Sequence, residues 1–140
     1  MPVHKTASPF GGAVAGTELG PMRITVSAAA NERYWASAGV DHPILRQGAL
    51  YPPVAANLAI LLFQTVATRP LLHTSQRLVS HRRGEAGTEL TVTGTVVDRY
   101  EKRGREYVDI EVAVITADAP DQPLWTSWVT FTPTATLGAA

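Results

Sequence analysis

The sequence predicts an α+β protein in which one long apolar helix is wrapped by an antiparallel sheet. Three observations predict it: an apolar run over residues 54–67, a double proline directly before this run, and Val- and Thr-rich segments after it. Prolines suit the first turn of a helix, and apolar residues on nearly every face indicate burial all round. The run is too short to span a bilayer and is interrupted by Asn57 and Gln64.

The other elements follow from hydrophobic periodicity and turn residues. Residues 22–26 favour a short strand, and residues 28–37 favour a helix with Ser27 as its N-cap. Glycines and prolines make residues 39–53 an irregular loop. Strands are predicted at residues 76–83, 89–100, 105–116 and 124–132, with a hairpin turn at 102–104. A sheet curled around the apolar helix satisfies this order with short connections, which is the hot-dog architecture.

Length and composition predict one domain and exclude several functional classes. The 140 residues suit a single hot-dog domain over 21–133, with a flexible arm over 1–20 and a flexible tail over 134–140. A formal net charge of zero provides no field that would attract nucleic acid or a membrane. Without cysteines or a metal-ligand spacing, we expect no metal and no cofactor. No targeting segment is visible, so we expect a cytoplasmic protein.

Three segments, taken in order, resemble a known family. They are GTELGPMRITVSAAANERYWASAGV with His42-Pro43 after it, YPPVAANL entering the long helix, and HRRGEAGTELTVTGTVV followed by the KRGREYVDIEV hairpin. Together they resemble the MaoC-like acyl-thioester hydratases and dehydratases, from about Gly16 to Pro133. The resemblance implies a hot-dog fold, a dimer, and a substrate carried by coenzyme A or an acyl carrier protein. The double proline is similar to the family's N-terminal-type domains, which often lack the catalytic residues.

The resemblance also locates the family's catalytic loop, in which this chain lacks the proton-transfer groups. Active members carry Gly-Asp-x-Asn-Pro-x-His, whose Asp and His activate water or remove a proton beside the thioester. Residues 39–45 read GVDHPIL, so Val40 and Leu45 stand at those two positions. Pro53 lies near the position of the amide that polarises the thioester carbonyl, and proline has no N–H. The resemblance therefore favours the fold and argues against the standard mechanism.

Four residues are candidates for the missing proton transfer. Asp41 and His42 could act as a shifted dyad only in a special turn, because consecutive side chains of an extended loop point apart. Tyr51 precedes the long helix at the mouth of the expected pocket and offers a phenol donor. His81 lies on a strand that we expect to border this pocket. The alternative for each is a structural role, such as a turn cap, a solvated ring or a packed aromatic.

Four further residues are candidates for substrate binding: Trp35, Asn57, Arg82 and Arg83. Asn57 lies one turn into the apolar helix, where its amide contacts either a ligand or loop carbonyls. Arg82 and Arg83 belong to a basic segment over 77–105 that would suit the phosphates of coenzyme A or of a phosphopantetheine group. Their alternative is pairing with nearby carboxylates.

These observations leave two main functions open. The first is an atypical dehydratase or hydratase, or a related lyase or cyclase, that acts on an acyl thioester or on a free polyketide-like molecule. The second is a non-catalytic hot-dog subunit that shapes the acyl-binding tunnel of a catalytic partner. We expect a homodimer, with a heterodimer with a catalytic homologue as the alternative. A ligand-binding module without chemistry is a third reading.

Overall fold

The structure is a computed structural model that describes residues 9–134. Within them, five strands and three helices follow one another along the chain. They are β1 (Glu18–Thr25), α1 (Ala28–Ser37), α2 (Pro43–Arg46), α3 (Val54–Gln64), β2 (Leu71–Ser80), β3 (Glu89–Lys102), β4 (Arg105–Thr116) and β5 (Trp125–Pro133). The strands form one antiparallel sheet in the order β1-β3-β4-β5-β2.

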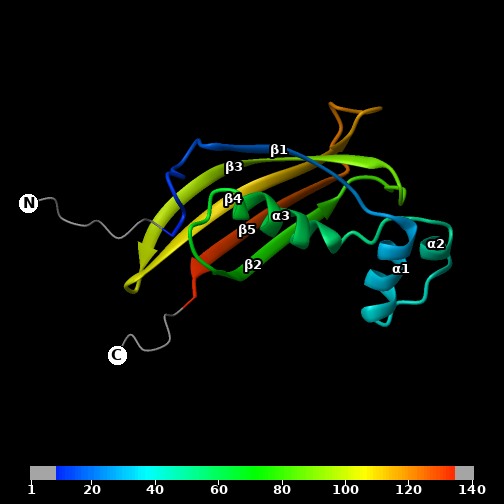
Figure 1. The fold of residues 1–140 in the computed structure, drawn as a ribbon, viewed down its shortest axis with the longest axis horizontal. Coiled ribbons are helices and arrows are strands. Elements are labelled where there is room, and N and C mark those ends of the chain that lie inside the picture. Colours follow the sequence, from blue (N-terminus) through cyan, green and yellow to red (C-terminus); the bar gives the residue numbers. More distant parts are fainter. Residues whose placement is uncertain (1–8, 135–140) are drawn as a thin grey trace, which may run out of the picture.

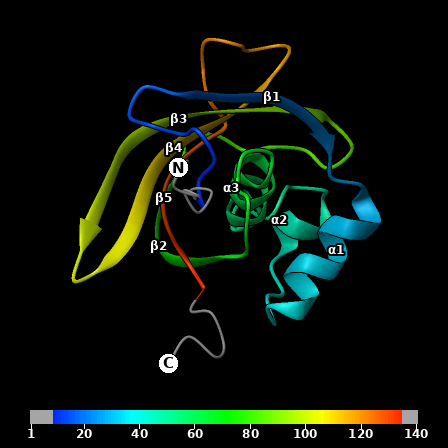
Figure 2. The ribbon, with the colours of Figure 1, turned by 60° about the vertical axis from the view of Figure 1, so that its left-hand side comes forward.

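The sheet curves around α3, which lies in its concavity (Figures 1 and 2). Helices α1 and α2 lie beside the N-terminal end of α3, and the ends of the described chain lie towards its other end. This arrangement confirms the predicted α+β hot-dog architecture. Among the described residues, no helix has both the length and the apolar character that crossing a membrane requires.

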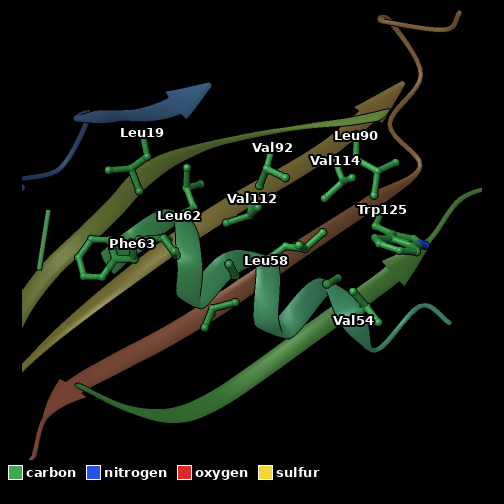
Figure 3. Close-up of a cluster of buried hydrophobic side chains, with 14 of the residues drawn as sticks. Leu19, Val54, Leu58, Leu62, Phe63, Leu90, Val92, Val112, Val114 and Trp125 are labelled. Carbon is green, nitrogen blue, oxygen red and sulfur yellow. The ribbon is translucent and has the colours of Figure 1, made fainter. Parts of the chain in front are cut away.

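Alternating side chains of the long strands fill the space between the sheet and α3 (Figure 3). On β4 the apolar residues Val108, Ile110, Val112 and Val114 are buried, while the residues between them face outward. Leu58 and Leu62 of α3 meet this inner face. Burying a side chain of this size contributes about 1.5–3 kcal/mol, so the core is the main source of the fold's stability.

Most predicted elements are confirmed, with differences at their ends. The helix over 28–37 with its Ser27 cap and the strand over 105–116 have the predicted bounds. The apolar helix ends at Gln64 rather than residue 67, because the next two N–H groups, of Thr65 and Val66, bond to carbonyl oxygens three residues earlier, at 3.3 and 3.1 Å. The strand predicted at 76–83 lies at Leu71–Ser80. The loop predicted over 39–53 contains the short helix α2.

The prediction that the apolar helix is buried all round is wrong. The sheet covers one side of α3, and Asn57, Leu61 and Gln64 on the other side are exposed, Leu61 by 42%. Asn57 is therefore a solvent-facing amide and not a buried one.

The predicted flexible arm also differs from the structure over residues 9–20. Phe10 is fully buried, and its ring lies 6.1 Å from that of Phe63. Strand β1 begins already at Glu18. The first eight residues of the predicted arm lie outside the described residues, as does all of the predicted tail after Thr134.

Candidate functional site

A hollow of about 200 Å³ lies near the N-terminal end of α3, where the family's catalytic loop would be expected. Three parts of the chain meet there: α2 with the loop that follows it, the segment after β2, and the start of β5. Its lining residues are Ile44, Leu45, Ala49, Leu50, Pro52, Ser80, Arg82, Arg83, Gly84 and Trp125. The wall is mostly apolar, with two guanidinium groups.

A buried asparagine of α1 fixes the loop that leads into α3. The Asn31 side chain is 1% exposed. Its Nδ2 donates to the carbonyl oxygen of Ala49 at 2.8 Å, and its Oδ1 accepts from the backbone N–H of Tyr51 at 3.0 Å. Both ends of the amide are therefore used, which satisfies two loop groups that would otherwise lack partners. Sequence reasoning missed this residue; its signal was a poor helix former inside an alanine-rich helix.

The same loop is held from its other side by the connection between β2 and β3. The Leu50 N–H donates to Gly84 O, and the Ala86 N–H donates to Gly48 O, both at 2.8 Å. Gly84 is closely packed, since a Cβ there would lie 2.7 Å from a methyl of Leu124 and 2.9 Å from one of Leu50. A larger residue at this position would have to displace the two leucine methyl groups, so glycine suits this contact and helps to position this wall of the hollow.

Arg82 connects the hollow to the turn before β5. Its Nη2 donates to the Thr116 hydroxyl at 2.7 Å and to the carbonyl oxygen of Gln122 at 3.3 Å. A hydrogen bond from the Thr116 side chain lowers the pKa of Asp118 below its usual value, and the Arg82 charge lowers it slightly further. Arg82 therefore holds this turn in place.

Arg83 holds the loop that precedes α3. Its Nε lies 2.6 Å from a carboxylate oxygen of Glu85, and its Nη2 donates to the carbonyl oxygen of Gln47 at 3.1 Å. The two predicted phosphate-binding arginines thus both line the hollow, and both already bind protein groups.

Apolar residues occupy the two positions that the resemblance aligns with the family's Asp and His. Leu45 is 7% exposed and lines the hollow, and Val40 is half-buried. Asp41 pairs with Arg46 at the surface. The Nδ1 of His42 accepts from the Ile44 N–H at 3.2 Å and caps α2. The structure gives Asp41 and His42 separate partners and forms no dyad between them.

The first turn of α3 offers no free amide to a ligand. Pro52 and Pro53 have no N–H. The next three N–H groups donate to carbonyl oxygens three residues earlier: Val54 to Tyr51 at 3.0 Å, Ala55 to Pro52 at 3.0 Å and Ala56 to Pro53 at 3.1 Å. Such short-range bonds use the groups that a helix N-terminus otherwise presents to an anion. A thioester carbonyl placed here would find no helix amide to polarise it.

Tyr51 and His81 have different surroundings. Tyr51 is half-buried against the core, and its hydroxyl makes no hydrogen bond with any residue from 9 to 134. The ring of His81 lies 2.8 Å from the Thr126 hydroxyl. Thr126 follows the inward-facing Trp125 on β5, so its side chain lies on the outer face of the sheet. His81 therefore lies away from the hollow that the strand was expected to border.

The last two candidates are also outside the lining of the hollow. Asn57 is exposed on α3. Trp35 is half-buried on α1, and its buried Nε1 has no hydrogen-bond partner among the described residues. Within residues 9–134, no three His, Asp or Glu side chains are grouped to hold a metal ion.

Comparisons with known proteins agree on the fold. No protein-family model matches the sequence, and no curated protein matches it. A HadBC (3R-hydroxyacyl-ACP dehydratase) complex from Mycobacterium tuberculosis matches at 17% identity and a TM-score of 0.64, over 85% of this chain and 96% of that one. An (R)-hydratase from A. caviae matches at 12% identity and a TM-score of 0.70, over 88% of this chain and 98% of that one.

A third similar structure is that of a MaoC-like dehydratase from Rhodospirillum rubrum. It is 16% identical, with a TM-score of 0.63 over 88% of this chain and 94% of that one. These similarities show that the chain has the hot-dog fold of MaoC-like dehydratases and (R)-hydratases. They agree with the resemblance found in the sequence.

Proposed function

We propose that this chain is a non-catalytic hot-dog subunit that binds an acyl thioester and works beside a catalytic partner. The single observation that carries the proposal is the closed first turn of α3, where two prolines and three internally bonded amides leave no donor for a thioester oxygen. Stabilisation of developing oxygen charge is the largest contribution to many acyl-transfer and related reactions. A site without this donor, and with Val40 and Leu45 at the proton-transfer positions, suits binding rather than turnover.

The hollow supports the binding part of the proposal. Its wall combines apolar side chains with the Arg82 and Arg83 guanidinium groups, a mixture that suits an acyl chain near a phosphorylated carrier. At about 200 Å³ it is smaller than typical small-molecule pockets of roughly 300–1,000 Å³. A second chain that closes over it would enlarge the enclosed volume.

The edge of the sheet supports the partner. Strand β2 is an edge of the five-stranded sheet, and residues 72–77 along it are exposed. An unpaired edge of this length is a ready template for a strand of another chain. The HadBC structure is itself described as a complex. We propose that β2 pairs with a second hot-dog chain, either a copy of this one or a catalytic homologue.

Calorimetric titration with a saturated acyl-coenzyme A tests the binding site without any reaction. Ser80 lines the hollow, and Ser37 is exposed at the end of α1. We expect Ser80→Trp to fill the hollow and weaken binding about tenfold or more, while Ser37→Trp leaves the affinity unchanged. Equal affinities for the two variants, or no binding by the unmodified chain, would contradict the site.

The mass in solution separates the two assemblies. A particle of twice the 15.0 kDa chain mass would support the homodimer. A particle of one chain mass would exclude the homodimer and leave the catalytic homologue as the partner to be tested by mixing.

An atypical dehydratase or hydratase is the second candidate, and Tyr51 favours it. This residue precedes the lining residue Pro52, and its hydroxyl is uncommitted within the described part of the chain. Under this alternative the purified chain converts an enoyl thioester by itself, and Tyr51→Phe abolishes the conversion.

A further inference from the structure

A second hollow, of about 270 Å³, lies on the outer face of the sheet beside the β3–β4 hairpin. Its residues are Thr74, Ser75, Tyr100, Lys102, Arg103, Tyr107 and Thr130. Tyr107 alternates with the inward-facing Val108 and therefore points away from α3. The hollow thus lies on the face opposite the candidate site and shares no lining residue with it.

A fixed aromatic pair forms one wall of this outer hollow. Tyr100 and Tyr107 lie directly opposite each other on β3 and β4, with ring centroids 5.5 Å apart and planes 16° apart. The Tyr100 hydroxyl donates to Asp109 at 3.2 Å, and the Thr130 hydroxyl donates to the same carboxylate oxygen at 2.7 Å. The rings are therefore held in place before any ligand arrives, which reduces the entropy lost on binding.

Two cations without partners stand at the rim. The side chains of Lys102 and Arg103 are exposed and make no hydrogen bond or ion pair with any residue between 9 and 134. Several other arginines, including Arg82, Arg83 and Arg99, bind carboxylates or backbone oxygens. An aromatic wall beside two uncommitted cations is a combination that binds phosphorylated planar rings.

The conformation of Arg103 is a second, independent observation. Arg103 and Gly104 form the two-residue turn between Lys102 and Arg105, with φ of +53° and +77°. Turns of this kind favour Asn-Gly, and a long side chain such as Arg is strained in the left-handed region. Strained residues cluster where function requires them. Here the strained residue is a cation that lines the hollow.

We propose that this outer hollow binds a nucleoside phosphate, with its base against the tyrosine pair and its phosphates on Lys102 and Arg103. Thr74 and Ser75 also line the hollow; the Thr74 hydroxyl donates to the carbonyl oxygen of Thr130 at 3.2 Å, which leaves the Ser75 hydroxyl as the group that suits the ribose. The nucleotide is either free or the nucleotide end of coenzyme A, since both present the same chemistry. The site is separate from the acyl-binding hollow and does not depend on it.

Calorimetric titration of the full chain with ADP tests the proposal, with adenosine and inorganic pyrophosphate as the two half-ligands. We expect ADP to bind more tightly than adenosine or pyrophosphate, and we expect its affinity to fall when salt is added. Tyr107→Leu should reduce the ADP affinity about fivefold or more, because base–aromatic stacking is lost. Displacement of ADP by coenzyme A would support the nucleotide end of the coenzyme as the source, and no displacement would support a free nucleotide.

Arg103→Asn separates binding from folding, because Asn suits the turn and removes the cation. We expect it to weaken ADP binding about fivefold while the melting temperature stays equal or rises. Arg23→Gln is the matched control, since the Arg23 side chain is exposed on β1, has no partner among the described residues and lines no described pocket. Equal weakening by both variants would reduce the effect to general charge attraction and overturn the site. Absence of ADP binding would overturn it as well, without bearing on the acyl-binding proposal.

Discussion

Replacing Asn31 by Ala should be among the most destabilising polar substitutions in this chain. The change removes both hydrogen bonds of a side chain that is 1% exposed. Each buried group left without a partner costs about 1–3 kcal/mol. Leaving the carbonyl of Ala49 without a partner should cost the full amount, because this residue is only 4% exposed. Leaving the N–H of Tyr51 without a partner should cost less, because this residue is half-buried. We therefore expect a loss of about 3 kcal/mol in the free energy of unfolding.

Urea unfolding and thermal melting measure this loss. A change of about 3 kcal/mol corresponds to a fall of roughly 10 °C in the melting temperature for a domain of this size. Asn57→Ala is the matched control, because the Asn57 side chain is exposed on α3 and makes no hydrogen bond with a described residue. Its effect should stay within about 0.5 kcal/mol. If Asn31→Ala lowered the free energy of unfolding no more than Asn57→Ala, the proposed role of Asn31 in fixing the loop before α3 would be refuted.

Two further predictions concern packing and pH. Gly84→Ala should lower the free energy of unfolding by about 2 kcal/mol in a urea titration, because its Cβ would lie 2.7 Å from a methyl of Leu124. Gly12→Ala is the control: its Cβ would meet no atom within 4 Å, so the free energy of unfolding should change little. Burial, followed by the Asp109 charge, raises the pKa of Tyr100 above its usual 10.0. Tyr100 therefore contributes stability below pH 10, and this contribution is lost as the pH rises through the raised pKa of Tyr100. Asp109→Asn should shift the absorbance titration of Tyr100 to lower pH.

The central elements of the fold were predictable because their periodicity reports burial directly. In strand β4, Val108, Ile110, Val112 and Val114 recur at every second position, with Asp109 and Glu111 between the first three, and the bounds of the strand were predicted correctly. The edge strand β2 has no such alternation over residues 72–77, because most of its side chains are exposed on both faces. The sequence therefore carried little signal for its first half. Phe10 was missed for another reason: its partner Phe63 is distant in the chain, and no local pattern reveals their contact.

The candidate site was predictable in part. The sequence showed Val40 and Leu45 at the positions that the resemblance aligns with the Asp and the His, and Pro53 near the position of the amide. The bonds that close the next three amides depend on backbone geometry, which residue types do not specify. The placement of His81 depended on strand register: a one-residue shift exchanges the two faces of a sheet. Its expected position beside the pocket therefore needed the structure to test it.

Turnover of a trans-2-enoyl thioester by the purified chain alone is the decisive test of the proposal that this chain binds without catalysing. We expect the thioester to bind and to be recovered unchanged, because the site has neither a proton-transfer pair nor a free helix amide. Hydration to a 3-hydroxyacyl thioester by the unmodified chain, at a rate proportional to its concentration, would contradict the account and establish an enzyme whose chemistry rests on other residues.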